Sequence, residues 1–255
     1  MDQTILVCKC VYANILGQKP TQLISSLTGR NIRIFVLDDL CLAATVKDKS
    51  LVELIQNNSV TIVACHKRAV KALLHFAGID LNRAELKFVD LRAETIESAL
   101  LAVKECESSL TRADVVNYNN QSSNGWYPWF PVIDSERCTN CKQCLNFCLF
   151  NVFGLDDSDH VKVINPQNCK TNCPACARIC PGVAIIFPKY TSSPINGSEI
   201  IDEELEKQRV KLDMEKILGS DPQQMLKRRS LAKRVKLFSQ DVSKKTGSDH
   251  FPNIR

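Results

Sequence analysis

Short apolar runs alternate with amphipathic stretches along the first hundred or so residues of the chain. The apolar runs have the length and flanking residues of buried strands, and they cover residues 4–7, 32–37, 60–64 and 86–89. Hydrophobic positions at helical spacing follow each of them, over residues 20–29, 51–57, 69–77 and 94–107. This alternation, with short connections, predicts a parallel sheet covered by helices in an α/β domain over residues 1–110.

Capping signals mark several ends of the predicted helices. Pro20 suits the first turn of the first helix, and Gly29 can close it. Ser50 and Glu53 have the spacing of a capping box that opens the second helix. Gly78 is placed to end the third helix.

The pattern changes after the last of these helices. Residues 111–130 are polar and turn-rich, which predicts a linker, and they run into an aromatic stretch at residues 126–131. We expect these aromatic side chains to pack against the following domain and to shield its site from water. Residues 131–190 form a cysteine-rich segment with a predicted hairpin between residues 152–155 and 161–164.

Residues 191–255 are predicted to form a helical, basic extension. Ser198 is expected to cap a helix that begins at Glu199 and ends at Gly219. Its predicted apolar stripe consists of Ile201, Leu205 and Leu212. A second helix is expected after Pro222, and the chain from Ser239 onward is expected to be disordered. The whole pattern predicts an α+β multi-domain protein.

Eight of the thirteen cysteines fall in two closely spaced runs. The runs read Cys138-x2-Cys141-x2-Cys144-x3-Cys148 and Cys169-x3-Cys173-x2-Cys176-x3-Cys180-Pro181. In a run of this kind the first three cysteines bind one cubane [4Fe-4S] cluster, and the fourth crosses over to the other cluster. The spacing therefore predicts one cluster held by Cys138, Cys141, Cys144 and Cys180. It predicts a second cluster held by Cys169, Cys173, Cys176 and Cys148.

Zinc sites and disulfide bonds are the alternatives for these cysteines. Zinc sites usually show two separated Cys pairs, and disulfides need an oxidising compartment for which the sequence gives no sign. The stretch resembles a bacterial-type ferredoxin domain with two four-iron clusters, over about a quarter of the chain. It departs from that family at Leu149, where a proline is usual, and in the three residues between Cys169 and Cys173.

Four further cysteines follow predicted strands of the α/β domain, and they are Cys8, Cys10, Cys41 and Cys65. Ligands of open parallel sheets bind outside the carboxyl ends of the strands, so these thiols could converge on a third cluster. They could also be buried small side chains or zinc ligands, and the first two could act as a redox dithiol. Cys106, within a helical pattern, is interpreted as a buried side chain.

Three segments add a second resemblance. They are Ile-Leu-Val-Cys-Lys-Cys at residues 5–10, Val-Ala-Cys-His-Lys-Arg at 63–68 and Phe-Ala-Gly-Ile at 76–79, with Cys41 between the first two. Their order resembles the N-terminal domain of the heterodisulfide reductase A-subunit family, although Val11 and His66-Lys67 depart from it.

In that family, cysteines of this domain ligate a four-iron cluster, so the resemblance implies a third [4Fe-4S] cluster on the four N-terminal cysteines. The family also carries a flavin-binding domain. No Gly-x-Gly-x-x-Gly follows a strand in this sequence, so we assign no flavin or nicotinamide site to it.

Charge and composition narrow the class of protein. The chain of 255 residues has a net charge of +5, and its basic residues concentrate after Pro222. The sequence has neither the apolar stretch of a signal peptide nor one long enough to span a membrane. Together with the cysteine content, this predicts a cytoplasmic protein in a reducing environment.

We therefore expect an iron–sulfur electron-transfer protein that relays single electrons to or from an oxidoreductase partner. The second resemblance implies that this partner handles flavin or disulfide chemistry. One alternative is a thiol reductase that uses the N-terminal cysteines. Another is a cluster-stabilised nucleic-acid-binding or regulatory protein that uses the basic arm, residues 227–236. Neither alternative explains the two full cysteine runs.

Overall fold

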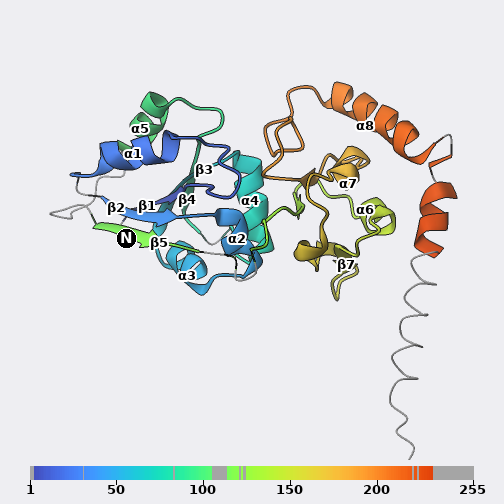
Figure 1. Ribbon diagram of the computed structural model, residues 1–255, viewed down its shortest axis with the longest axis horizontal. Coiled ribbons are helices and arrows are strands. Elements are labelled where there is room, and N and C mark those ends of the chain that lie inside the picture. The colour runs from blue at the N-terminus through green and yellow to red at the C-terminus, as the bar shows by residue number, and fades with distance from the viewer. Residues whose placement is uncertain are drawn as a thin grey trace, which may run out of the picture.

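The computed structural model describes residues 3–30, 32–82, 84–104, 114–120, 122, 125–219, 221–222 and 224–231. A five-stranded parallel sheet with helices packed on its two faces forms the first half of the molecule (Figure 1). A cysteine-rich module built mainly of loops lies beside it, and a long helix borders that module on the side away from the sheet. Predicted features in residues 232–255, and Cys106, lie outside the described residues.

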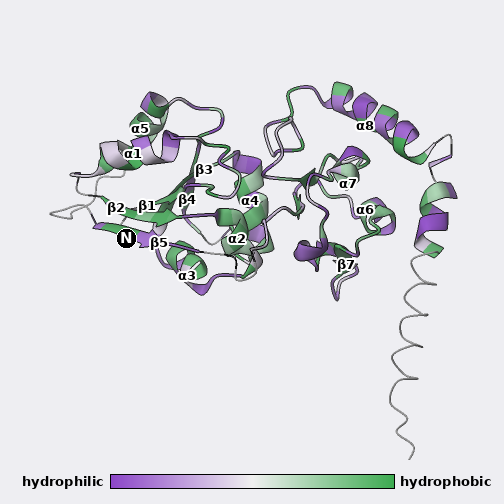
Figure 2. Ribbon diagram, in the orientation of Figure 1, coloured by the Kyte–Doolittle hydropathy of each residue, from purple (hydrophilic) through white to green (hydrophobic). Residues whose placement is uncertain are grey.

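The sheet has the strand order β4-β3-β1-β2-β5, and neighbouring strands are parallel throughout. Four of its strands confirm the predicted apolar runs, namely β1 (Gln3–Cys8), β2 (Arg33–Leu37), β3 (Ser59–Ala64) and β4 (Leu86–Asp90). Ile5, Leu6 and Val7 of the central strand are all inaccessible to solvent, because helices cover both faces of a parallel sheet. Figure 2 shows this hydrophobic centre in green.

The fifth strand, β5 (Asp114–Tyr118), lies in the stretch that the sequence predicts as a linker. It pairs with β2 at the edge of the sheet, and the Tyr118 ring stacks on Phe35 at a centroid distance of 5.8 Å. Only Val115 and Tyr118 are partly buried. An edge strand needs few apolar side chains, so its hydrophobic pattern was too weak to predict it.

Five helices connect the strands, with the bounds α1 (Lys19–Leu27), α2 (Leu40–Thr45), α3 (Lys49–Asn57), α4 (Lys67–Phe76) and α5 (Ile96–Lys104). Four of them confirm predicted helices. The capping box predicted at Ser50 is wrong, because Asp48 caps α3 by accepting a hydrogen bond from the Leu51 N–H at 3.1 Å. Helix α2 was not predicted, since five of its six residues are buried and it has no polar face.

The cysteine-rich module contains short elements, and they are β6 (Val132–Ile133), α6 (Gln143–Phe147), β7 (Phe153–Leu155), β8 (Val161–Val163), the 3-10 helix η1 (Pro166–Asn168), α7 (Ala175–Arg178) and β9 (Ile185–Ile186). β7 and β8 form the predicted hairpin, and β6 pairs with β9 in antiparallel fashion. The pairing of β6 with β9 brings the start and the end of the module together, and both cysteine runs contribute residues to one small hydrophobic core.

Aromatic side chains join this module to the sheet domain. Trp129 belongs to the core of the module, whereas its neighbour Phe130 belongs to the core around the sheet. The Phe130 ring packs against Phe76 of α4 at 5.4 Å. The predicted packing role of this aromatic stretch is therefore confirmed, and its shielding role stays a prediction.

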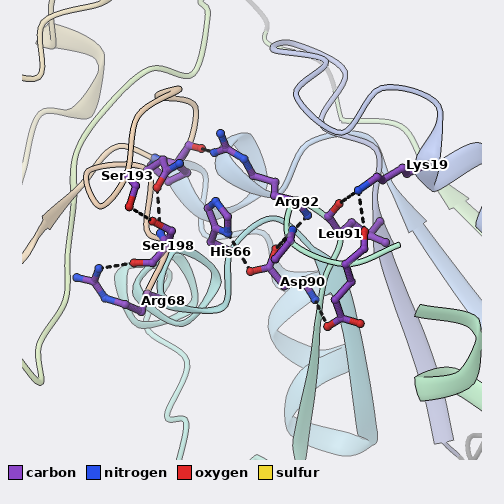
Figure 3. Close-up of polar contacts among 12 residues, drawn as sticks. Lys19, His66, Arg68, Asp90, Leu91, Arg92, Ser193 and Ser198 are labelled. Carbon is purple, nitrogen blue, oxygen red and sulfur yellow. Dashed lines mark hydrogen bonds and ion pairs between the residues drawn. The ribbon is translucent and has the colours of Figure 1, made fainter. Parts of the chain in front are cut away.

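Arg68 of α4 adds a polar connection between the two parts. It donates hydrogen bonds to the Asp134 carboxylate and to the carbonyl oxygens of Val183 and Ser198, at 3.1, 3.0 and 2.8 Å. Figure 3 shows the contact with Ser198. The guanidinium thus contacts three separate segments of the cysteine-rich half, which fixes that half against α4.

The C-terminal part is helical, as predicted, but its first helix begins later. α8 (Glu203–Leu218) is capped by Asp202, which accepts from the N–H groups of Glu204 and Leu205, and not by Ser198. The predicted stripe of Ile201, Leu205 and Leu212 is wrong: these side chains are exposed, and Val210 and Leu218 are buried instead.

Residues 224–231 are helical as well, as expected after Pro222. Within the residues described, no helix is both long enough and apolar enough to cross a membrane.

Candidate metal centres

Cys138, Cys141, Cys144 and Cys180 form a first group of thiols. Cys138 and Cys141 lie in the loop after β6, Cys144 lies in α6, and Cys180 follows α7. The pKa of Cys144 is raised to about 12, first by burial and then by the thiols of Cys180, Cys141 and Cys138. The four cysteines predicted to hold one cluster are therefore neighbours in the fold.

Cys148, Cys169, Cys173 and Cys176 form a second group. Cys148 ends α6, and Cys176 lies in α7, which packs against α6. Burial raises the pKa of Cys176 well above the ordinary range, and Cys148 and Cys169 are the thiols that add most to it. The last cysteine of each run thus lies with the first three of the other run.

Two tight turns shape the cysteine runs. Asn140 lies between two cysteines of the first run and Asn172 between two of the second, and both have left-handed backbones with φ of 54° and 60°. Asparagine tolerates this conformation better than most residues. Asn172 belongs to the three-residue spacer that departs from the usual spacing, so the extra residue is taken up in a turn.

The hairpin is tied to the first run through Asn140. Its side chain donates to the Asp159 carbonyl at 2.9 Å and accepts from the Val161 N–H at 3.0 Å. Leu149, the other departure from the ferredoxin pattern, is exposed on the surface. Leucine in place of the usual proline at this position therefore leaves the two groups of four cysteines intact.

Gly182, two residues after Cys180, is predicted to be intolerant of any side chain. A Cβ there would lie 2.6 Å from the Arg137 carbonyl oxygen, next to Cys138. We expect Gly182→Ala to destabilise the fold by about 1–3 kcal/mol, because the backbone of the first cysteine run must shift. Denaturant unfolding measures this cost. Gly154→Ala is the matched control, since its Cβ would meet only the flexible Ile164 side chain, and an equal cost for both variants would contradict the prediction.

The third group consists of Cys8, Cys10, Cys41 and Cys65, and all four are buried. Cys8 ends β1, Cys10 follows it, Cys41 lies in α2, and Cys65 follows β3. They line a small cavity at the carboxyl ends of the strands, together with Asp39 and Lys189. The predicted convergence of these thiols at the sheet edge is present in the fold.

Burial and repulsion between neighbouring cysteines raise the pKa values of these thiols as well. The pKa of Cys65 is raised to about 12, first by burial and then by Cys10, against the opposing effect of Arg92. The pKa of Cys8 is raised well above its ordinary value by burial, then by Cys10 and Asp39. The Leu40 N–H donates to the Cys8 sulfur at 3.3 Å, which favours a negatively charged sulfur at this position.

The donor set suits iron–sulfur clusters by its chemistry. Each group offers four thiols, and four-iron clusters are held by four cysteine thiolates. In the described part of the chain, no three His, Cys, Asp or Glu side chains are grouped for one metal ion.

His66 is not among the groups of thiols. It precedes α4, and its Nδ1 lies 2.9 Å from the Asp90 carboxylate (Figure 3). Burial acts to raise the pKa of Asp90, but hydrogen bonds, above all that from His66, lower it overall. The pair therefore gives His66 a structural role at the start of the helix.

Two residues of the N-terminal cavity were missed in the sequence. Asp39 gave no sign beyond its position after a strand, and Lys189 lies far away in the chain between Pro188 and Tyr190. Their side chains form an ion pair of 2.6 Å, and both are almost fully buried. The position of Asp39 just after β2, at the carboxyl end of a parallel strand, could have suggested it, whereas nothing local suggests Lys189.

The geometry agrees with comparisons to known proteins. Residues 130–211 match the family of 4Fe-4S dicluster domains. The chain is 43% identical over 63 residues to an uncharacterized ferredoxin of Methanocaldococcus jannaschii, covering 24% of this chain and 41% of that protein. It is 33% identical over 92 residues to Ferredoxin-3 of a Nostoc species, covering 29% of this chain and 89% of that protein.

These similarities and the grouped thiols define an iron–sulfur protein with a module of the kind that binds [4Fe-4S] clusters. Through its cysteine-rich module the chain belongs to the ferredoxin family. It spans about two fifths of the length of the archaeal relative, and both relatives match only a part of this chain.

Proposed function

We propose that this protein is a three-cluster electron relay. One [4Fe-4S] cluster is assigned to Cys138, Cys141, Cys144 and Cys180, and a second to Cys148, Cys169, Cys173 and Cys176. A third is assigned to Cys8, Cys10, Cys41 and Cys65. The observation that carries the proposal is that twelve cysteines gather in three groups of four, each of which combines cysteines from separate segments of the chain.

The surroundings of the thiols support a relay. Hydrophobic side chains such as Trp129, Phe147 and Phe153 pack around the second group, and sheet residues pack around the third. When bound, each cluster supplies one-electron chemistry at a potential set by net charge, hydrogen bonds to sulfur and solvent exposure. The protein's own residues hold the thiols in place, and they exclude water from the four buried thiols of the third group.

Iron content tests the number of clusters. We expect anaerobically reconstituted protein to contain about twelve irons and about twelve sulfides per chain, because each group of four thiols accommodates one cubane. Cys41→Ala is expected to remove about four irons and one EPR signal of the reduced protein, with the others unchanged. About eight irons in the unsubstituted protein would contradict the third cluster and would agree with the two ferredoxin clusters.

The alternative of a thiol reductase receives less support from the fold. A reactive thiol needs a lowered pKa and access to its substrate. Cys8 and Cys10 are both buried, and burial is the first cause of the raised pKa of each. A cluster-ligating role is therefore preferred over a catalytic dithiol at this position.

The partner is proposed to be a redox protein with an acidic surface. Arg229 stacks on the Phe147 ring at 4.5 Å, beside the second group of thiols, and Lys227 and Arg228 are exposed on the same helical segment. Exposed Leu149 and Phe150 lie next to Cys148 and add apolar contact area. Cations around an apolar patch suit brief docking to an acidic protein, and the flavin or disulfide chemistry of the partner remains part of this proposal.

Salt dependence tests this docking. We expect electron transfer to an acidic one-electron acceptor protein to slow several-fold between low and physiological salt, because screening weakens attraction between surface charges. Lys227→Glu with Arg228→Glu is expected to slow transfer at low salt and to flatten the salt dependence, with cluster content unchanged. Salt-sensitive retention on duplex or single-stranded nucleic acid, with no effect on electron transfer, would favour the nucleic-acid alternative.

A further inference from the structure

The third group of thiols is enclosed partly by the ferredoxin module. Pro188 and Lys189 line the cavity that the four N-terminal cysteines share, although they follow β9 at the end of the module. The Lys189 amine reaches the Asp39 carboxylate at 2.6 Å, and the two side chains are 2% and 1% exposed. A lysine is almost never buried to this degree without a partner.

Arg92 holds the segment that carries this lysine. Arg92 follows β4, and its guanidinium donates to the carbonyl oxygens of Pro188 and Tyr190, at 3.1 to 3.3 Å (Figure 3). These two residues flank Lys189 on either side. The rings of Tyr12 and Tyr127 lie 5.8 Å from the Lys189 amine, one from each half of the molecule. The position of the cation is therefore fixed from both halves.

The charge of Lys189 acts on the thiols. The Lys189 amine is buried and donates to the buried Asp39 carboxylate at 2.6 Å, and a charged pair of this kind keeps the amine protonated. At Cys10 and Cys41, the attraction of Lys189 is stronger than the repulsion of Asp39. At Cys8, Asp39 is the member of this ion pair that affects the pKa of the thiol, and it raises that pKa. Lys189 lines the same small cavity as the four cysteines, so its charge lies beside their sulfurs.

A cubane held by four thiolates carries net negative charge and gains one more negative charge on reduction. A fixed buried cation favours the more negative state, and in a medium of low dielectric constant its effect is larger than at the surface. Arg92 acts on Cys65 in the same sense. The cations at this site therefore favour the reduced cluster.

We propose that Lys189 is a positioning residue that the ferredoxin module supplies to the N-terminal site, where it raises the reduction potential of the cluster on Cys8, Cys10, Cys41 and Cys65. Asp39 opposes it and limits this effect. The inference rests on the proposed third cluster. It implies that electrons entering through the ferredoxin clusters are drawn toward the α/β domain only while the two halves are docked.

Potentiometric EPR titration of two variants tests the inference. Lys189→Met is expected to lower the ratio of reduced to oxidised third cluster at least tenfold at a fixed solution potential, which is a shift of about 59 mV in the midpoint of a one-electron couple. Asp39→Asn is expected to shift the same midpoint in the opposite direction. Asn retains the side-chain oxygen that accepts from the Leu42 N–H, so the cap of α2 is kept. The signal of the third cluster is identified by its absence from Cys41→Ala.

A second ion pair near the site serves as the control for nonspecific effects of a removed charge on the midpoint potential. Lys9 and Asp38 also lie 2.6 Å apart at the same strand ends, but Lys9 is 31% exposed. Lys9→Met and Asp38→Asn are expected to leave the midpoint unchanged, because solvent screens this pair. The potentials of the two ferredoxin clusters serve as internal controls in every variant.

The outcomes separate this inference from the proposed function. About eight irons in the unsubstituted protein contradict the third cluster itself. About twelve irons with an unmoved midpoint in Lys189→Met overturn the role of Lys189 alone. If Lys189→Met fails to retain its third cluster, Asp39→Asn decides: a raised midpoint supports the inference, and an unchanged or lowered one overturns it. Lys189→Arg, which keeps the charge, is expected to restore iron content and midpoint.

Discussion

Cys148→Ala is expected to abolish the second cluster and to leave the first intact. Cys148 belongs to the first run in sequence, but among the thiols it acts most strongly on Cys176 of the second. Cys180, from the second run, is likewise the thiol with the strongest effect on Cys144. Each run therefore ends in the group of the other, as in ferredoxins with two clusters.

Iron analysis and EPR of the reduced protein measure this effect. We expect a loss of about four irons, together with loss of the signal that disappears in Cys173→Ala and survival of the signal that disappears in Cys141→Ala. The reciprocal variant, Cys180→Ala, is expected to match Cys141→Ala. If Cys148→Ala instead removed the same signal as Cys141→Ala, the two runs would bind their clusters separately, without crossing.

Arg68→Met is expected to destabilise the protein by about 3 kcal/mol, a large effect for one charged residue of a helix. The Arg68 side chain is only 16% exposed, and its loss leaves Asp134 without its ion-pair partner and two carbonyl groups without a donor. Hydrogen bonds to charged groups contribute about 1.5–3 kcal/mol each when they are sheltered from water. We expect the two halves to separate more readily as well, which limited proteolysis of residues around the junction can follow.

A second ion pair on the same helix provides the control. Lys71 lies one turn further along α4 and pairs with Glu136 at 3.3 Å, but the Glu136 side chain is 77% exposed. Lys71→Met is expected to cost less than about 1 kcal/mol, because exposed pairs are screened by water and salt. Denaturant unfolding of both variants, in protein reconstituted to the same iron content, gives the comparison. Equal losses for the two would show that Arg68 does not join the halves.

Most of the fold could be predicted because its signals are local. Apolar residues predominate in each of the four predicted strands, although only Val89 of β4 is buried, and each predicted helix has a hydrophobic stripe. The sequence failed to predict two elements whose burial is atypical of their class. β5 is an exposed edge strand and α2 a fully buried short helix, so neither shows the period that identifies its class. The caps of α3 and α8 moved by a few residues, since Asp48 and Asp202 compete well with the serines chosen in the sequence.

The cysteine runs by themselves predicted the ligands of two clusters, because iron–sulfur ligation requires a fixed spacing along the chain. The four N-terminal cysteines are spread over 58 residues, from Cys8 to Cys65, and have no such spacing. Their convergence follows from parallel strand topology, which brings the carboxyl ends of β1, β2 and β3 to one edge. Only the tertiary structure could add Lys189, which is 150 residues from Asp39 in the chain. Pairing of buried charges depends on distance in space, and sequence carries no local signal for it.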